Sequence, residues 1–139
     1  MFDLIVRNAK LTDTKDLVDV GIEGGTIIEV GPALVADAGE EIDAAGQLVI
    51  PPFVDSHFHM DATLSLGQPR LNTSGTLLEG IEIWGELKPD LTAEAIKKRA
   101  LTLLHWSIAR GTLAIRTHVD VTDPSLLAVD VLLEVREEM

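Results

Sequence analysis

The chain contains no cysteine among its 139 residues. Disulfide bonds and thiolate metal sites are therefore excluded, including the cysteine-ligated zinc site of the deaminases that carry a Pro-Cys-x-x-Cys motif. No run of about 18 apolar residues is present, and the first residues lack the basic segment and long apolar segment of a signal peptide. From these absences we expect a cytoplasmic protein with no membrane partner.

Basic residues are scarce as well. The chain has 11 Lys plus Arg against 23 Asp plus Glu, which gives a formal net charge of -12. No basic cluster offers a binding surface for phosphate, so we expect no nucleic acid partner. Hydrophobic residues, by contrast, make up 46% of the chain, which is enough for a globular core.

The first 50 residues predict a small unit of short, mostly antiparallel strands. Strand-like runs cover residues 2–11, 18–22, 26–30 and 41–43. The pair Gly24-Gly25 separates the second run from the third and allows the positive φ angles of a tight hairpin. We expect residues 1–50 to form one domain and residues 51–139 to belong to another.

Residues 48–61 read Leu-Val-Ile-Pro-Pro-Phe-Val-Asp-Ser-His-Phe-His-Met-Asp. The apolar beginning is typical of a strand buried on both faces, and polar residues follow at its end. On a strand, the side chains of His57 and His59 point the same way, about 6.6 Å apart, so both imidazoles can bind one metal ion. A pair of structural or surface histidines is the alternative. The carboxylates of Asp55 and Asp61, at the same spacing, favour a metal site because they can orient the imidazoles.

The segment 62–84 mixes apolar residues with Gly, Pro, Asn and Ser. It is too interrupted for a long helix or strand and too apolar for a solvated linker. We therefore expect an ordered loop that forms a wall of a pocket.

The remaining residues predict a helix, a strand and a second helix. Thr92 is a suitable N-cap for the first helix, and Gly111 a suitable end. Residues 112–121 form an apolar run that becomes polar at its end, and Asp123 with Pro124 predicts the start of the last helix. This order indicates a parallel α/β sheet with its site beyond the carboxyl ends of the strands.

Two further polar residues lie near the end of the second predicted strand. We expect His118 and Asp120 at the mouth of the site, near the metal without binding it, and a hydrogen-bonded structural pair is the alternative. Two parallel strands cannot close a barrel and would leave both sheet edges bare. We therefore expect this chain to be part of a longer protein.

Four segments carry a family resemblance. They are Pro-Pro-Phe-Val-Asp-Ser-His-Phe-His-Met-Asp at 51–61, Gly-Gln-Pro at 67–69, Asn-Thr-Ser-Gly-Thr-Leu-Leu-Glu-Gly-Ile-Glu-Ile-Trp at 72–84, and Arg-Thr-His-Val-Asp-Val at 116–121. The first is similar to the first-strand metal motif of the amidohydrolase superfamily, with Pro51-Pro52 where Pro-Gly is usual. The others resemble bacterial cytosine deaminases, a narrower family within that superfamily.

The resemblance implies an α/β fold, namely the N-terminal part of a (β/α)₈ TIM barrel preceded by part of a small β-sandwich. It implies one divalent metal ion, iron or zinc, bound by His57 and His59 with a histidine and an aspartate from later strands. Leu77 matches a substrate-binding residue, while Asp61, His118 and Asp120 fall near the site. The proton-shuttling glutamate and a base-binding glutamine would lie beyond residue 139, and the full-length protein would be a homo-oligomer.

The implied reaction is hydrolytic deamination of a small-molecule nucleobase, cytosine, to uracil and ammonia. Three alternatives remain open. The enzyme could act on another cyclic amidine or amide of the creatinine, isoguanine or triazine type. The protein could be a non-catalytic homologue, or the chain could be an inert fragment.

Overall fold

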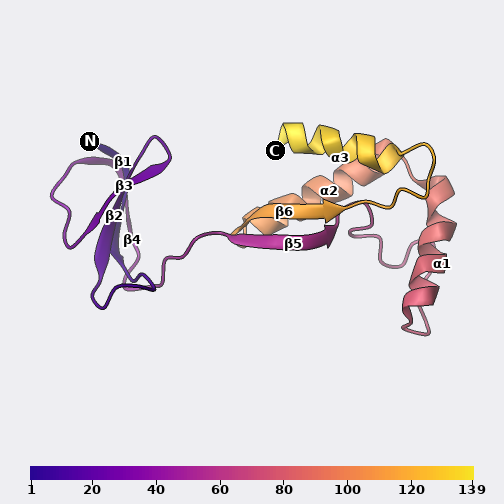
Figure 1. Cartoon of the computed structure of the whole chain (residues 1–139), viewed down its shortest axis with the longest axis horizontal. Helices are drawn as coiled ribbons and strands as arrows, with labels where there is room; N and C mark the ends of the chain where they lie inside the picture. The colour runs from indigo at the N-terminus through magenta and orange to yellow at the C-terminus, as the bar shows by residue number, and fades with distance from the viewer. The chain divides into compact units, whose positions relative to one another are not determined.

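The computed structural model describes all 139 residues. They form two compact units, Met1–Pro51 and Pro52–Met139. The first contains strands β1 to β4, and the second contains strands β5 and β6 with all the helices (Figure 1). None of the helices combines the length and the apolarity needed to span a bilayer.

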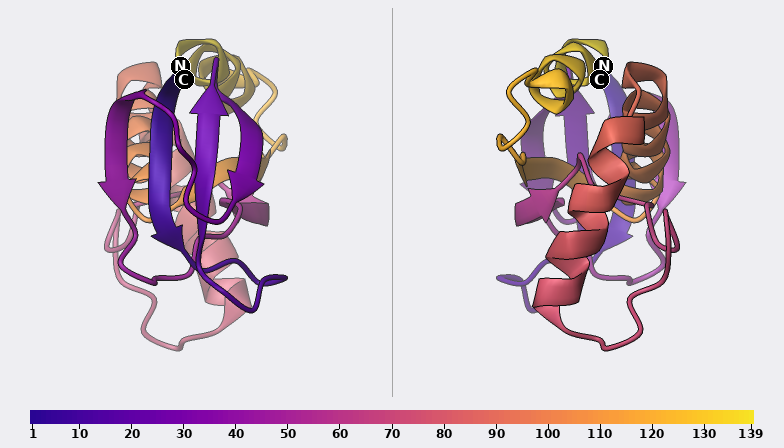
Figure 2. Two further views of the ribbon diagram at one scale, coloured as in Figure 1. Left: turned by 90° about the vertical axis from the view of Figure 1, so that its left-hand side faces the viewer. Right: turned by 90° about the vertical axis from the view of Figure 1, so that its right-hand side faces the viewer.

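The first unit is a four-stranded sheet in the order β3-β2-β1-β4 (Figure 2, left). Its strands are β1 (Phe2–Ala9), β2 (Val18–Glu23), β3 (Thr26–Gly31) and β4 (Ala38–Asp43). The expected antiparallel pairing holds for β1 with β2 and for β2 with β3. Strand β4 is the exception, because it lies parallel to β1.

The predicted hairpin between β2 and β3 is confirmed. Gly24 and Gly25 have φ angles of 57° and 73°, and Glu23 pairs with Thr26 across the turn. Two consecutive positive φ angles define the turn type whose twist matches that of the flanking strands. Glycine adopts these angles without the steric penalty of a Cβ atom.

A partly buried ion pair ties the sheet to the loop before β4. Asp19 is 5% exposed and accepts hydrogen bonds from Arg7 Nη1 at 2.8 Å and from the backbone nitrogens of Asn8 and Leu34, each at 3.0 Å. The second nitrogen of the guanidinium donates to Glu41 at 2.6 Å. Because the buried carboxylate of Asp19 is paired with Arg7, this cluster has a structural explanation.

The second unit is built on a parallel pair of strands, β5 (Phe53–His59) and β6 (Thr112–His118). Helices α2 (Ala93–Ile108) and α3 (Leu127–Glu138) lie together on one side of that pair (Figure 1). Their shared core consists of Met60, Ile96, Ala100, Val131, Leu132 and Val135. The unit is therefore the mixed α/β structure that the order of elements predicted.

The expectation that the metal-motif strand is buried on both faces is wrong for this chain. Phe53 and Val54, at the start of β5, are 57% and 69% exposed. The helices cover one side of the β5-β6 pair, and these two apolar side chains have no cover.

Part of the predicted loop 62–84 is a helix. Helix α1 runs over Leu77–Leu87, and the hydroxyl of Thr76 caps it by accepting a hydrogen bond from the backbone nitrogen of Glu79 at 3.3 Å. Gly80 and Gly85 lie inside the helix, and each lowers the local helix propensity by about 1 kcal/mol relative to alanine. For this reason the sequence pattern did not predict the helix, which buries Ile83 and Leu87. A short 3₁₀ turn, η1 (Lys88–Asp90), follows it.

The prediction for α2 is confirmed at its start. Thr92 caps the helix by accepting a hydrogen bond from the backbone nitrogen of Ala95 at 3.2 Å. Gly111, placed between α2 and β6, has a φ angle of 84°, the left-handed conformation expected there.

The predicted start of the last helix is wrong. Asp123 accepts hydrogen bonds from the backbone nitrogen and hydroxyl of Ser125 at 3.0 and 2.5 Å, so its carboxylate closes a local turn and caps no helix. Helix α3 begins at Leu127, after Leu126 in a left-handed conformation. Strand β6 is also shorter than predicted, because it ends at His118.

Candidate metal centre

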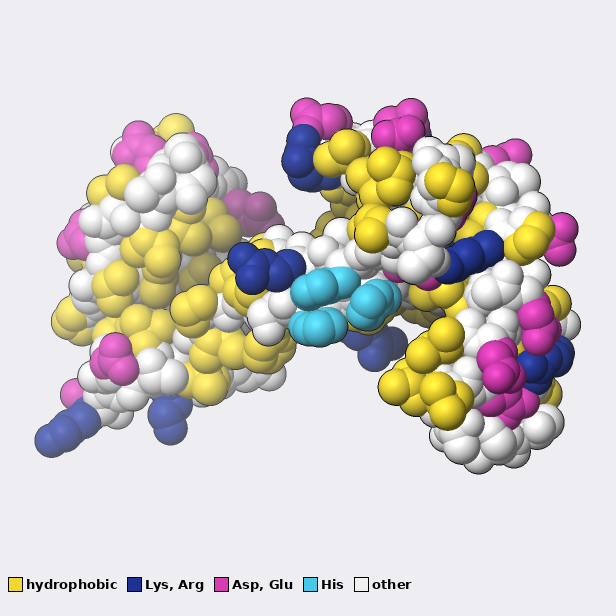
Figure 3. Space-filling view, turned by 45° about the vertical axis from the view of Figure 1, so that its right-hand side comes forward, with side chains coloured by type: hydrophobic (Ala, Val, Ile, Leu, Met, Phe, Trp, Pro, Cys, Tyr) yellow, Lys and Arg dark blue, Asp and Glu magenta, His cyan; other side chains and the backbone are white.

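Three imidazole rings meet where β5 and β6 end. The ring centroids of His57 and His59 are 5.5 Å apart, and those of His59 and His118 are 5.7 Å apart. The rings of His57 and His118 are stacked, with centroids 4.0 Å apart and planes at 15°. All three side chains are exposed and form one patch on the surface of this unit (Figure 3).

An irregularity in β5 produces this arrangement. Asp55 lies opposite Ile115, whereas Phe58 lies opposite Thr117, so β5 contains one more residue than β6 between these two pairs. Such a bulge changes the direction of a side chain on the strand. Strict two-residue alternation therefore does not describe His57, whose ring lies against that of His118.

A side-chain contact fixes the register at the ends of the two strands. The backbone nitrogen of Met60 donates a hydrogen bond to Thr117 Oγ1 at 3.0 Å. His59 and His118 come next to these residues and are paired across the strands. Both imidazoles are thus anchored to regular backbone.

The spacing of His57 and His59 fits a shared metal ion. With metal–nitrogen distances of about 2.0–2.1 Å and tetrahedral angles, two coordinating imidazoles have centroids about 5 Å apart. The 5.5 Å between these rings is close to that value, whereas the 4.0 Å between His57 and His118 is shorter. Neutral imidazole is a good ligand for zinc and for iron. No group of three or more His, Asp or Glu side chains in the chain is arranged to hold an ion, so these two residues would form part of a ligand set.

The two flanking carboxylates bond to backbone groups and not to imidazoles. Asp55 Oδ1 accepts a hydrogen bond from the backbone nitrogen of His57 at 3.1 Å. Asp61 Oδ2 accepts one from the backbone nitrogen of Asp120 at 2.9 Å. Each carboxylate therefore shapes the backbone that carries the histidines.

Asp61 lies inside the unit, with 1% of its surface exposed. The segment around it is held by Arg99 of α2, whose Nε donates to the carbonyl oxygen of Thr63 at 3.0 Å and whose Nη2 donates to that of Asp61 at 3.1 Å. These two hydrogen bonds anchor the segment after β5 to helix α2.

Asp120 lies in an ion pair with the end of α1. Its Oδ2 accepts hydrogen bonds from Trp84 Nε1 at 2.9 Å and from Lys88 Nζ at 2.5 Å. Hydrogen bonding to Lys88 is the main reason that the pKa of Asp120 is well below its usual range. Asp120 therefore bonds toward α1, while His118, two residues earlier, stacks on His57.

Leu77 is the first residue of α1 and is 79% exposed. Its neighbours Leu78 and Ile81 are 73% and 58% exposed, so the beginning of the helix presents an apolar surface. The role of Leu77 in binding substrate stays a prediction. The segment before α1 lines a cavity of about 190 Å³.

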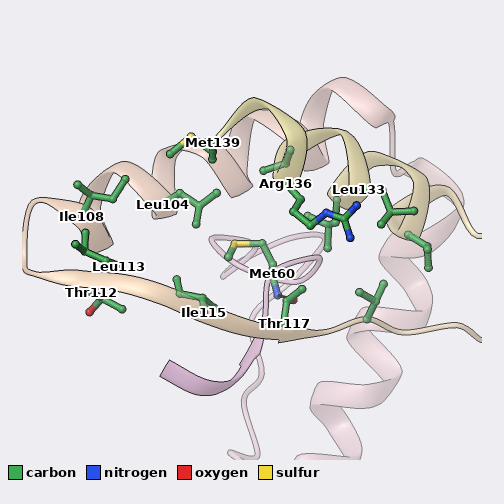
Figure 4. A pocket seen from close by; sticks show the side chains of 14 residues that line it. Met60, Leu104, Ile108, Thr112, Leu113, Ile115, Thr117, Leu133, Arg136 and Met139 are labelled. Carbon is green, nitrogen blue, oxygen red and sulfur yellow. Dashed lines mark hydrogen bonds between the residues drawn. The ribbon is translucent and has the colours of Figure 1, made fainter. Parts of the chain in front are cut away.

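An apolar groove beside β6 was not predicted from the sequence. This groove, of about 590 Å³, lies between the strand and helices α2 and α3 (Figure 4). Its lining includes Leu104, Leu113, Ile115 and Leu133, and the single charged residue is Arg136. Because it contains none of the histidines, the groove is separate from the candidate metal centre.

Comparison with known proteins identifies the family. Residues 40–135 match the model described as the amidohydrolase family. The chain belongs to this family. Amidohydrolases are generally metal-dependent hydrolases of carbon–nitrogen bonds.

The amidohydrolase chain is similar to enzymes that act on nitrogen heterocycles. It is 38% identical over 143 aligned residues to N-isopropylammelide isopropyl amidohydrolase from Pseudomonas sp. strain ADP, covering 99% of this chain and 36% of that protein. It is 44% identical to the solved 5-methylcytosine deaminase from Klebsiella pneumoniae liganded with phosphonocytosine, with a TM-score of 0.88, covering 96% of this chain and 33% of that one.

A third relative is the solved N-isopropylammelide isopropylaminohydrolase from Burkholderia multivorans ATCC 17616. The identity is 31% and the TM-score 0.78, covering 99% of this chain and 35% of that one. The chain thus spans about a third of the length of the relatives that it matches. It corresponds to their N-terminal part.

Proposed function

We propose that this amidohydrolase chain is the metal-binding part of a longer enzyme that hydrolyses cytosine to uracil and ammonia. The observation that carries the proposal is the pair His57 and His59, with ring centroids 5.5 Å apart at the end of a parallel strand. The 44% identity to a 5-methylcytosine deaminase supports a pyrimidine substrate.

The proposal includes the architecture of the full-length protein. Strands β5 and β6 would be the first two strands of a (β/α)₈ barrel, with residues 51–139 belonging to that domain. The uncovered side chains of Phe53 and Val54 support this, because further strands and helices would bury them. Residues 1–50 would contribute to a small β-sandwich. The full-length enzyme would be a homo-oligomer.

In the mechanism, His57 and His59 would hold one divalent ion, iron or zinc. When bound, such an ion supplies a nucleophile at neutral pH, because it lowers the pKa of a bound water toward about 7. The two histidines act as neutral imidazole ligands, so they bind the ion only when deprotonated. His118, stacked on His57, restricts the orientation of that ring.

The other predicted residues position the substrate. Leu77 would lie against the flat face of the pyrimidine, since an apolar side chain suits a planar ring. Asp120, through Lys88 and Trp84, fixes the helix that carries Leu77 to the ends of the strands. A carboxylate outside these 139 residues would move the proton to the leaving ammonia. The net charge of -12 is consistent with an uncharged free base and not a polynucleotide as substrate.

A second candidate function is removal of an alkylamine from an N-alkylated triazine. Two relatives named for N-isopropylammelide match 99% of this chain, at 38% and 31% identity. The metal-binding pair would serve either reaction, because both are attacks of water on a ring carbon that bears a nitrogen leaving group. Contacts between the enzyme and the substrate ring would decide between the two reactions.

The experiment measures ammonia release by the full-length protein from cytosine, 5-methylcytosine, creatinine and isoguanine, and isopropylamine release from N-isopropylammelide, with added iron or zinc. We expect the wild type to have its highest kcat/KM for cytosine. The His57→Ala variant should release no product above background. Faster turnover of N-isopropylammelide would favour the second candidate. Equal rates for the wild type and His57→Ala on every compound would contradict a metal-dependent hydrolase.

A further inference from the structure

A small cavity lies behind the end of the metal-motif strand. Its volume is about 20 Å³, and its polar lining comes from Asp61, Lys88, Asp120, Asp123 and the indole of Trp84. Apolar side chains of α2 and of the start of α3 close the rest of it, including Ile96 and Leu127. The cavity therefore joins α1, the end of β5 and the segment after β6.

One carboxylate oxygen at this cavity has no partner in the protein. Asp61 is 1% exposed, and its Oδ2 accepts a hydrogen bond from the backbone nitrogen of Asp120. Its Oδ1 is buried and accepts none. Buried polar atoms of native proteins nearly always have a hydrogen-bond partner, and ordered water supplies it where the protein does not.

The cavity has the size and the donor for one water molecule. A water needs about 10–15 Å³ of such space and typically makes about three hydrogen bonds. The ammonium group of Lys88 has three N–H donors. Two of them face Asp120 Oδ2 and Thr122 Oγ1, and the third has no partner in the protein. The indole N–H of Trp84 already donates to Asp120.

We propose that the cavity binds one ordered water, which accepts a hydrogen bond from Lys88 Nζ and donates one to Asp61 Oδ1. Asp61 is then a positioning residue. It connects the strand that carries His57 and His59 to the end of α1, the helix that carries Leu77. The positioning role of Asp61 rests on the proposed function, because it treats Leu77 as part of the substrate pocket.

The first test is a crystal structure of the full-length protein at a resolution that shows ordered water. We expect density for one water within about 2.6–3.2 Å of both Asp61 Oδ1 and Lys88 Nζ. A dry cavity, or a protein group that donates to Asp61 Oδ1, overturns the water site. This test does not depend on any substrate.

The second test compares Asp61→Asn and Asp61→Leu with Asp130→Leu, an exposed aspartate of α3 that serves as a matched control. Asparagine still accepts the hydrogen bond from Asp120, whereas leucine accepts none and removes the contact to the water. We expect Asp61→Leu to raise KM for cytosine about tenfold, with metal content unchanged, and Asp61→Asn to restore most of the affinity.

The outcomes separate positioning from other roles. An unchanged KM in Asp61→Leu, or a loss of metal in proportion to activity, contradicts the positioning role. If Asp61→Leu does not fold, a crystal structure of Asp61→Asn still tests the water site. The water must then bridge Lys88 and the side-chain amide of the asparagine. If no substrate is turned over by the wild type, the proposed function fails while the water site stands or falls on the density alone.

Discussion

The imidazole of His118 stacks on that of His57, with ring centroids 4.0 Å apart and planes at 15°. The two residues come from neighbouring parallel strands, so the contact joins β5 to β6 through side chains in addition to their backbone pairing. A stacked ring restricts rotation of its neighbour and leaves the nitrogens in the ring plane free. His118 can therefore orient a metal ligand without being one.

This relationship predicts different effects for two substitutions at His118. Phenylalanine keeps an aromatic ring against His57, so His118→Phe should bind zinc within about twofold of the wild type. Alanine removes the ring, and His118→Ala should bind zinc about tenfold more weakly, the effect typical of losing a group that orients a ligand. Competition with a chromophoric chelator measures both affinities. An equal, large loss in His118→Phe would show that a nitrogen of His118 binds the ion.

The metal ligands themselves give a second prediction. His57→Ala or His59→Ala in the full-length protein should remove most of the bound metal, because the remaining ligand loses the chelate geometry. Metal content of purified protein, measured by mass spectrometry, provides the readout. His105→Ala is the matched control, since His105 is an exposed histidine on α2. Full metal occupancy in His57→Ala would rule out the site.

The start of α1 should respond to acid through Glu79. Hydrogen bonds from Ser74, followed by pairing with Arg70, lower the pKa of Glu79 from 4.5 to about 2. A carboxyl with a lowered folded-state pKa stabilises the protein above its unfolded pKa and loses that contribution as the pH falls toward the folded one. The contribution of Glu79 is therefore complete above about pH 4.5 and declines between pH 4.5 and 2.

Substitution of Glu79 tests this pH dependence. Glu79→Gln should lower Tm at pH 6, and the difference from the wild type should shrink as the pH falls below 4.5. Thermal melts of both proteins at a series of pH values measure it, with Glu94→Gln as a control at the exposed start of α2. A difference in Tm that stays constant down to pH 3 would contradict the assignment.

The 139 residues on their own should be inactive and poorly folded. The groove of about 590 Å³ beside β6 and the exposed Phe53 and Val54 leave apolar surface uncovered. The chain supplies two of the expected metal ligands and two of the eight strands of the proposed barrel, so we expect aggregation or partial unfolding and no deamination of cytosine. Size-exclusion chromatography and thermal melting check this. A monomer with a cooperative melt would contradict it.

Local signals in the sequence determined much of the fold. The Gly24-Gly25 hairpin and the Thr92 cap were predicted because each depends on a few consecutive residues whose backbone preferences are strong. That His57 and His59 lie close together near the end of one strand was predictable from their spacing, although the bulge in β5 breaks the strict alternation on which the prediction relied. The histidine motif at 51–61 resembled that of the amidohydrolases, and the match over residues 40–135 shows that family.

Tertiary contacts decided what these local rules could not. Helix α1 forms despite Gly80 and Gly85, because burial of Ile83 and Leu87 outweighs a weak local propensity. Asp123 had the residue type of a helix cap, but its carboxylate bonds to Ser125 instead.

In the candidate site, too, some features follow from local sequence and others require tertiary contacts. That His57 and His59 lie close together follows from the sequence, whereas the stack of His57 on His118 requires the bulge in β5 and the parallel pairing with β6. The hydrogen bond between Asp61 and Asp120 joins residues 59 positions apart. Contacts at such separations depend on how strands and helices pack, and no pattern of neighbouring residues encodes them.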